Sequence, residues 1–506
     1  MPRSFPIALC LLLQVLLPIR AQEQHDHGIP EELGTVSFPV SCAPAVQQEF
    51  NRGVALLHSF AYAPALAAFQ QVATADPQCA MARWGEAMTY FHQLWDPALS
   101  PQTIPLAQQE IQAAQNCPAC SPREQQFISG LALIFQDVKS IPYPVRAERY
   151  QGAMRELSAH YPGDSESQIF YALALLANVD PTDRTHTRQK QALAVLEPLY
   201  GQYPHHPGIA HYIIHASDNA ELASQGLPAA RAYARIAPSA PHALHMPSHI
   251  FTRLGLWDDS IASNLAARQA ANRQGDIGEE LHAMDYLVYA YLQSGRYDEA
   301  LEVIRQLKTM PGLDRSNFKV GYAATAMPIR FAVERGQWTD AAQIASPQEA
   351  PPHVAALAVW ARGLGFAHTG RPREAQDEAE KLQRLQEELV SHQQVYWSVQ
   401  TEILKNEVLG WIAEAGGDPE RAESLLRRCA DQEDAIEKLP VTPGPVLPAR
   451  EQLGSLLLVH HQPAPALKEF RTAIANAPGR RGALAGESLA TSAGSSGKPA
   501  SSLNKR

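Results

Sequence analysis

Histidine residues gather in the middle of this chain at helical spacing. His211 with His215 and His245 with His249 form two pairs four residues apart. A random scatter of the chain's histidines would give roughly one such pair over the whole length. Residues at i, i+3 or i+4 and i+7 share one face of a helix. Three polar stripes follow this rule on successive predicted helices: His211, His215 and Asp218; His242, His245 and His249; His282, Asp285 and Tyr289.

These side chains have the types and spacing of a transition-metal site. Neutral imidazole is a common protein ligand for zinc, copper and nickel. A pair at i and i+4 can hold one ion, and a facing pair completes four-coordination. The predicted ligands are His211, His215, His245 and His249, with His242 or His206 in reserve. Asp218, Asp285 and His282 are predicted to surround the ligands, where a carboxylate accepts the second ring N–H and fixes the tautomer.

Pro247 is the point at which this geometry is weakest. A proline inside a helix kinks it or marks its true start. If the helix begins at Pro247, His245 lies before the first turn and its pairing with His249 loosens. The proposed ion is zinc or copper.

Two other interpretations of the histidines remain open. Buried helical histidines often bind only a carbonyl or an aspartate, and a polar stripe also suits a peptide-binding groove. Alternatively, the protein is an enzyme in which a metal ion with an open coordination position activates water or oxygen, and Asp218 or Asp285 transfers protons. No Gly-x-Ser-x-Gly, phosphate-binding glycine loop or His-Glu-x-x-His is present. We therefore assign no catalytic residue and favour a scaffold over an enzyme.

The elements that must position these residues are helices. From about Pro44 the chain has helical periodicity almost throughout and no convincing alternating strand. A phrase of glycine, a turn residue and an alanine-rich helix returns along the chain, where glycine suits the left-handed cap that ends a helix. The phrase is clearest in residues 295–301, Gly-Arg-Tyr-Asp-Glu-Ala-Leu. Its glycines are Gly255, Gly295, Gly336, Gly370 and Gly417.

This phrase resembles the tetratricopeptide repeat family, whose helical hairpins of about 34 residues stack into a right-handed superhelix. The resemblance covers residues 42–478 and implies an all-α solenoid of stacked helix-turn-helix hairpins. Residues 50–53, 76–81 and 245–250 are similar to those of exported bacterial repeat proteins of this family.

The family geometry implies that the first helix of each hairpin lines the concave surface. The first helices would be 207–218, 242–254 and 278–294, inside a histidine-rich central region at 205–294. Their stripes would then lie side by side in the inner groove. The resemblance also implies a protein or peptide partner in that groove.

The chain ends and the charge indicate an exported protein. Residues 1–21 carry an early arginine, a short apolar run and a small residue at Ala21, typical of a signal peptide. Its removal takes the formal charge from −10 to −12. We therefore expect a periplasmic or secreted protein without nucleic-acid partner or membrane span. Residues 22–41 are predicted to be a flexible N-terminus and 479–506 a disordered tail.

Four cysteines are candidates for disulfide bonds in an oxidising compartment. Cys42 and Cys79 precede neighbouring predicted helices and could join them. Cys117 and Cys120 have redox-motif spacing, but no strand-helix-strand pattern surrounds them, which favours a local structural bond. Cys429 is left over as a buried thiol.

Overall fold

The computed structural model describes residues 31–94, 99–348 and 350–496. The predicted signal peptide at 1–21 lies outside them. Contacts divide the chain into Met1–Glu31 and Glu32–Arg506, and the second unit is described below. Its described residues form helices and no strand. The predicted all-α solenoid is confirmed.

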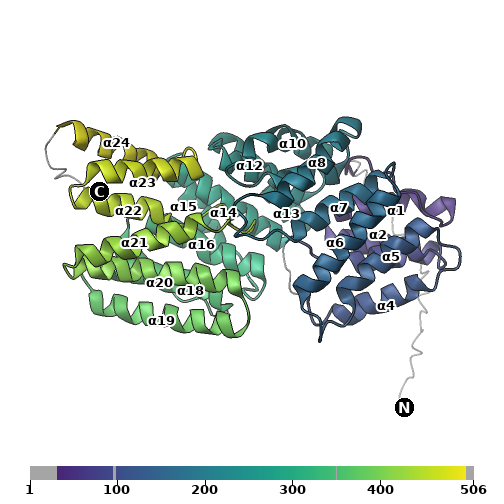
Figure 1. Ribbon diagram of the computed structural model, residues 1–506, viewed down its shortest axis with the longest axis horizontal. Coiled ribbons are helices and arrows are strands. Elements are labelled where there is room, and N and C mark those ends of the chain that lie inside the picture. The colour runs from purple at the N-terminus through teal and green to yellow at the C-terminus, as the bar shows by residue number, and fades with distance from the viewer. Residues whose placement is uncertain (1–30, 95–98, 349, 497–506) are drawn as a thin grey trace, which may run out of the picture. The chain divides into compact units, whose positions relative to one another are not determined.

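Consecutive helices pack as antiparallel hairpins, and each hairpin packs on the next (Figure 1). The N-terminal hairpins contain α1 (Gln47–His58), α2 (Tyr62–Ala75), α3 (Ala80–Met88), α4 (Ile104–Gln115), α5 (Pro122–Phe135), α6 (Tyr143–His160), α7 (Ser165–Ala177) and α8 (Thr187–Gln202). The central ones contain α9 (Pro207–Ala216), α10 (Ala223–Ile236), α11 (Pro241–His245), α12 (Pro247–Arg253), α13 (Trp257–Gln274), α14 (Ile277–Gln293) and α15 (Tyr297–Thr309). The C-terminal ones contain α16 (Phe318–Glu334), α17 (Trp338–Ala341), α18 (Pro352–His368), α19 (Pro372–Ser391), α20 (Val395–Ala415), α21 (Pro419–Asp434), α22 (Ala449–Val459), α23 (Pro463–Asn476) and α24 (Arg481–Ser496).

The glycines of the repeated phrase have the predicted conformation. All five have positive φ, between 62° and 77°. Each lies just after the first helix of a hairpin, where the chain reverses into the second. Left-handed backbone is costly for residues with a Cβ, so glycine is the residue that this turn favours.

We expect Gly255→Ala to destabilise the protein more than Gly370→Ala. Both glycines are left-handed, so either change costs about 1–2 kcal/mol. A Cβ on Gly255 would also lie 2.5 Å from the carbonyl oxygen of Pro478, whereas a Cβ on Gly370 meets nothing within 4 Å. Chemical unfolding of the two variants measures the difference; equal losses would contradict the backbone clash.

A stretch of turns and bends crosses the first helices of the central and C-terminal hairpins. We call residues 436–447, between α21 and α22, the inner segment. The hydroxyl of Tyr286 in α14 lies 3.3 and 3.2 Å from the carbonyl oxygens of Pro440 and Thr442. Arg330 in α16 donates to Thr442 Oγ1 at 2.8 Å. The surface that we predicted as an open groove is therefore covered, at these helices, by the chain itself.

A cavity of about 170 Å³ remains between the inner segment and the C-terminal hairpins. Its walls include the aromatic rings of Tyr322, Trp360, Tyr396 and Trp397. None of the six central histidines, at 211–282, lines it. The cavity and the histidine cluster are therefore separate places in the fold.

Two segments that composition marked as flexible are packed. Phe38 is fully buried, and its ring centroid lies 5.0 Å from that of Phe127. The flexible N-terminus predicted for 22–41 is therefore wrong for residues 32–41, whereas 22–30 lie outside the described residues. Likewise, the tail predicted from 479 contains α24, which packs on α23 because Gly486 lets the helix approach the ring of Phe470.

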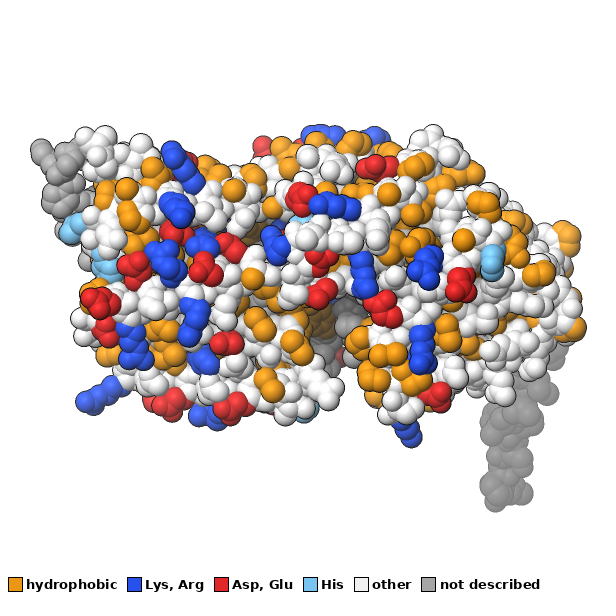
Figure 2. Space-filling model, in the orientation of Figure 1, with side chains coloured by type: hydrophobic (Ala, Val, Ile, Leu, Met, Phe, Trp, Pro, Cys, Tyr) orange, Lys and Arg blue, Asp and Glu red, His pale blue; other side chains and the backbone are white. Residues whose placement is uncertain are grey.

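The surface charges are mixed, and four cysteines are joined in two disulfide bonds. On the face in Figure 2, basic and acidic side chains are interspersed without a broad basic area. Disulfide bonds join Cys42 to Cys79 and Cys117 to Cys120, and Cys429 is a buried free thiol. Among the described helices, none is long and apolar enough to cross a membrane.

We expect His368→Phe to flatten the acid dependence of stability. His368 is partly buried between Trp338, on which it stacks, and Trp411, with ring centroids 3.9 and 4.2 Å away. Burial lowers the pKa of this imidazole to about 4. As the pH falls below about 6.5, the ordinary pKa of histidine, the unfolded chain binds a proton at this position before the folded chain does. The free energy of unfolding therefore decreases between about pH 6.5 and 4, by on the order of 3 kcal/mol.

The free energy of unfolding of wild type and His368→Phe, measured at pH 7 and pH 4, tests this. Between pH 7 and pH 4, the variant should lose about 3 kcal/mol less of its free energy of unfolding than the wild type loses. The matched control is His160→Phe at an exposed position, which should keep the wild-type pH dependence. An unchanged pH dependence in His368→Phe would count against the buried neutral imidazole.

Candidate metal centre

Six histidine side chains from four helices meet in the central hairpins. α9 supplies His211 and His215, and α11 supplies His242 and His245. α12 supplies His249 and α14 supplies His282. These six form two groups, in each of which one ligand nitrogen per residue lies within 4.8 Å of the others. We call His211, His215 and His242 the first trio, and His245, His249 and His282 the second trio.

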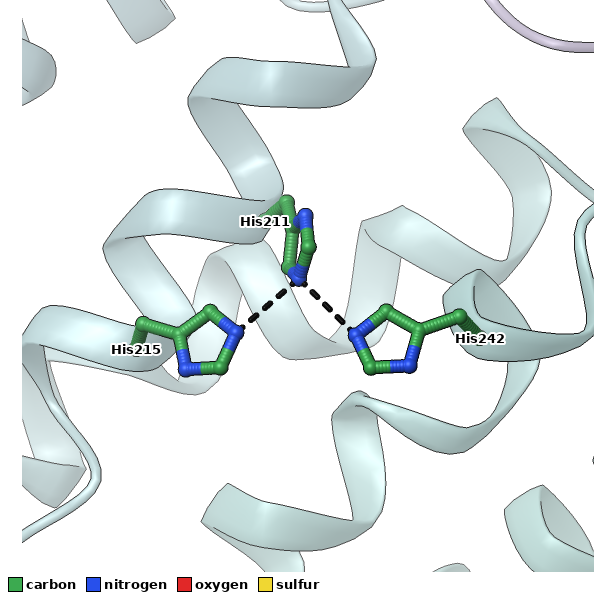
Figure 3. A group of neighbouring side chains, drawn as sticks. All are labelled: His211, His215 and His242. Atoms are coloured by element: carbon green, nitrogen blue, oxygen red, sulfur yellow. Dashed lines mark hydrogen bonds between the residues drawn. The ribbon is translucent and has the colours of Figure 1, made fainter. Parts of the chain in front are cut away.

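The first trio converges on the ring of His211 (Figure 3). Nε2 of His211 lies 3.0 Å from Nε2 of His215 and 3.2 Å from Nε2 of His242. His211 and His242 are at most 2% exposed, whereas His215 is partly exposed. The trio therefore reaches solvent through His215 alone.

The second trio is completely buried. Nε2 of His245 lies 3.0 Å from Nε2 of His249. The His282 ring centroid lies 4.3 Å from that of His245. For metal–nitrogen bonds of about 2.0–2.1 Å, two ligands of one ion lie about 2.9–3.4 Å apart, depending on the angle. The Nε2 separations of the pairs His211–His215, His211–His242 and His245–His249 fall in this range.

The other ring nitrogen, Nδ1, is fixed by an acceptor in four of the six histidines. The acceptors are His58 O for His211 at 2.6 Å, Glu279 Oε2 for His242 at 3.1 Å, Asn264 Oδ1 for His245 at 2.6 Å and Asp218 Oδ2 for His249 at 2.9 Å. The amide of Asn264 is oriented by its own donation to Ser260 O at 2.8 Å. Each of these four Nδ1 atoms must therefore donate a proton.

This hydrogen-bond pattern leaves bare nitrogen atoms facing one another. A neutral imidazole that carries its proton on Nδ1 has only a lone pair on Nε2. In the pairs His211–His242 and His245–His249, lone pair therefore faces lone pair at 3.2 and 3.0 Å. Such a contact is repulsive unless a cation lies between the nitrogens. Backing of Nδ1 by an oxygen acceptor is also how metal-bound histidines are held.

Protons are poor candidates for that cation. Burial lowers the pKa of His211, His215, His245 and His282 well below the ordinary value, and lowers that of His249 to about 4. Neighbouring histidines lower several of these pKa values further. At neutral pH these five imidazoles are uncharged, which is the form that binds metals.

Asp218 connects the second trio to the inner segment. Its carboxylate accepts from His249 Nδ1, from Arg253 Nε at 2.8 Å and from Lys438 Nζ at 2.8 Å. Burial alone would raise the pKa of Asp218, but Lys438 and Arg253 hold it well below its usual range. The carboxylate is therefore ionised and can orient His249.

Two local features keep the rings in place. Pro247 divides the predicted helix into α11 and α12, but Met246 between them keeps helical angles of φ −54° and ψ −35°. His245 and His249 therefore stay on one face despite the break. Phe60 follows α1 with φ 53°, unusual for a residue with a Cβ, and its ring centroid lies 4.4 Å from that of His211.

The predicted ligands lie together, but in a different grouping. The two i,i+4 pairs were expected to share one ion, whereas each pair has its own third histidine. His242 belongs to the first trio, and His282, predicted to lie outside the ligands, belongs to the second. The sequence could not show this, because the third ring of each trio comes from a neighbouring helix.

Two other expectations do not match the structure. The carboxylate of Asp285 points toward α16 and pairs there with Arg330, Oδ1 to Nε at 2.8 Å, instead of orienting a ligand histidine. His206, the reserve ligand, lies with His58 on Glu166, each Nε2 at 2.9 Å from a carboxylate oxygen. In this third group of buried residues, the carboxylate of Glu166 faces the imidazoles of His58 and His206. The lone pairs of two ring nitrogens therefore do not face each other there.

Several contacting residues escaped sequence reasoning. Glu279 precedes His282 by three positions on one helix face, a signal that was available. Tyr286, four positions after His282, stacks on His249 with 4.9 Å between ring centroids, whereas the predicted stripe contained Tyr289. Asn264 and Lys438 gave no signal, because they come from other parts of the chain.

We expect Asp218→Asn to weaken metal binding at the second trio only. Loss of the oxygen that orients a ligand histidine typically reduces metal affinity by about 10–100-fold. In the first trio, His58 O and Glu279, not Asp218, accept from Nδ1 of His211 and His242, so this trio should keep its affinity. Competition with a chelator of known affinity resolves the two classes of site. The exposed Asp298→Asn is the control, and equal weakening at both trios would contradict this assignment.

Comparisons with known proteins identify no relative by sequence: no family model and no curated protein matches. Among solved structures, the P58(IPK) TPR domain matches with a TM-score of 0.22 and 12% identity, over 90% of this chain and 99% of that one. The Naa15/Naa10 complex bound to HypK-THB gives 0.26 and 9%, over 83% and 62%. A circular tandem repeat protein gives 0.15 and 12%, over 89% and 96%. No conclusion about activity follows from these likenesses.

Proposed function

We propose that this protein is an exported helical-repeat scaffold that binds two transition-metal ions, one in each histidine trio. The observation that carries the proposal is the pair of Nε2–Nε2 contacts whose nitrogens are both unprotonated. A metal ion converts each repulsive contact into two coordinate bonds. Three imidazoles per site suit zinc or copper.

The location and the partner remain parts of the proposal. The disulfide between Cys42 and Cys79 supports an oxidising compartment, in keeping with the predicted signal peptide. A protein or peptide partner on the face of the first helices stays a prediction. The inner segment covers that face at α14 and α16, so a partner would bind the uncovered hairpins or displace the segment.

An enzymatic role is the alternative, and one observation favours it. Each trio offers three protein ligands, which leaves one position of a four-coordinate ion for another molecule. Closed structural sites usually supply four protein ligands. The described residues nevertheless place no general acid or base beside that position, so we assign none.

Metal content of protein purified without a histidine tag tests the proposal. After equilibration with zinc or copper and removal of excess, the wild type should retain two ions per chain. His211→Ala and His245→Ala should each retain one, and the double variant none. His160→Ala, at an exposed position outside the trios, is the control and should retain both. Wild-type protein without stoichiometric metal would overturn the proposal.

A further inference from the structure

The cavity between the inner segment and the C-terminal hairpins has no part in the proposed metal sites. Its volume of about 170 Å³ is close to that of a cavity that holds one benzene molecule. Helices α16, α18 and α20 line it with four aromatic side chains: Tyr322, Trp360, Tyr396 and Trp397. A ligand of this cavity would therefore be small and would lie among aromatic rings, which attract cations.

Every lysine and arginine side chain that lines this cavity is paired with a carboxylate of the protein. The ion pairs are Arg184 with Glu437, Arg253 and Lys438 with Asp218, Arg450 with Asp434, and Arg480 with Glu451. The positive charges of the wall are therefore balanced within the chain itself. An anionic ligand would have to compete with these carboxylates for its partners.

Two acidic side chains of the wall, Glu407 and Glu433, form no ion pair with a described residue. Glu407 in α20 accepts from the indole N–H of Trp360 at 2.6 Å, and Glu433 in α21 accepts from the backbone N–H of Ala449 at 2.8 Å. Glu407 is only 1% exposed. Burial raises the pKa of its carboxyl group well above the ordinary value, and the nearby Glu433 raises it further. A cation in the cavity would supply the missing partner and favour the carboxylate form.

His353 in α18 adds an unused hydrogen-bonding group to the wall. It is 8% exposed and stacks on Trp397, with 4.5 Å between ring centroids. Neither of its ring nitrogens has a hydrogen-bond partner in the described part of the chain, which is rare for buried polar atoms. Burial lowers the pKa of His353 to about 4, so at neutral pH its ring is uncharged and offers one donor and one acceptor. A hydroxyl group of a ligand can pair with either nitrogen.

We propose that this cavity binds a small alkylated ammonium compound that carries a hydroxyl group. The aromatic rings and the carboxyl group of Glu407 bind the ammonium end, and His353 binds the hydroxyl. An alkylated ammonium group suits this wall because its methyl groups pack on aromatic rings that also attract its charge. The inference goes beyond the proposed function and does not depend on it, because none of the trio histidines lines the cavity.

Calorimetric titration of the wild-type protein with choline and with dimethylbutanol tests the role of charge. Dimethylbutanol has the shape and the hydroxyl group of choline, but a carbon atom replaces the ammonium nitrogen. Choline should bind at one site per chain, and the alcohol should bind at least about tenfold more weakly because it lacks the attraction of a cation to the rings. Equal affinities, or no binding of choline, would overturn the proposal. The comparison needs no variant, so it does not depend on how a substitution affects folding.

Two variants test the parts of the site. Glu407→Gln keeps an oxygen for Trp360 but removes the carboxylate, and should weaken choline binding by about tenfold. His353→Phe should weaken the binding of choline but not that of tetramethylammonium, which has no hydroxyl group. The matched control is Glu388→Gln at an exposed position, which should bind choline as the wild type does. Unchanged choline affinity in Glu407→Gln, or an equal loss for both ligands in His353→Phe, would overturn this site.

Discussion

Removal of both bound ions is expected to lower the free energy of unfolding of the wild-type protein by about 8 kcal/mol, about 4 kcal/mol for each ion, when the reference contains free metal at a thousand times its dissociation constant. An ion bound only by the folded chain stabilises that chain. The effect should be large here because the trios hold bare nitrogens face to face at 3.0 and 3.2 Å. Without an ion, this repulsion between the facing nitrogens lowers the stability of the folded chain.

Thermal unfolding with metal and with excess chelator measures this difference. The double variant His211→Ala with His245→Ala is the matched control, because it removes one nitrogen from each facing pair. Its midpoint should not depend on metal. A wild-type midpoint that is the same with metal and with chelator would show that the imidazoles are satisfied without an ion.

Asp285→Ala is expected to destabilise the protein by about 3–5 kcal/mol, the usual cost of breaking a buried ion pair. Asp285 and Arg330 both have fully buried side chains, with Oδ2 and Nη2 3.2 Å apart. The same guanidinium donates to Thr442 and to Gly444 O at 3.1 Å, and so holds the inner segment. Removal of the carboxylate leaves a charge inside the protein and loosens that segment.

Chemical unfolding of Asp285→Ala gives the loss of stability. Asp285→Leu with Arg330→Met removes both charges and should recover much of it, since apolar pairs often replace buried ion pairs without cost. Metal affinity separates this role from the one predicted from the sequence. Asp285→Asn should leave affinity unchanged, in contrast to Asp218→Asn. A drop in affinity would restore Asp285 to the metal site.

Local sequence patterns were sufficient for the helices and their turns. The period of apolar residues reports which face of a helix is buried, and this depends only on neighbours along the chain. The left-handed glycines, such as Gly295 with φ 77°, were predictable for the same reason. Composition was a poorer guide at the ends, because the small residues of α24 are a close-packing surface rather than a sign of disorder.

The sequence by itself also determined which histidines could act in pairs. Helical geometry brings His211 and His215 together within α9, and it brings His245 and His249 together across the break at Pro247, where Met246 keeps helical angles. Only the tertiary structure decided the division into two trios. Its physical reason lies in the Nδ1 partners: a side chain such as Asn264, or a backbone carbonyl such as that of His58, turns each ring so that Nε2 points inward. Those acceptors are supplied by packing between helices, which helical spacing does not encode.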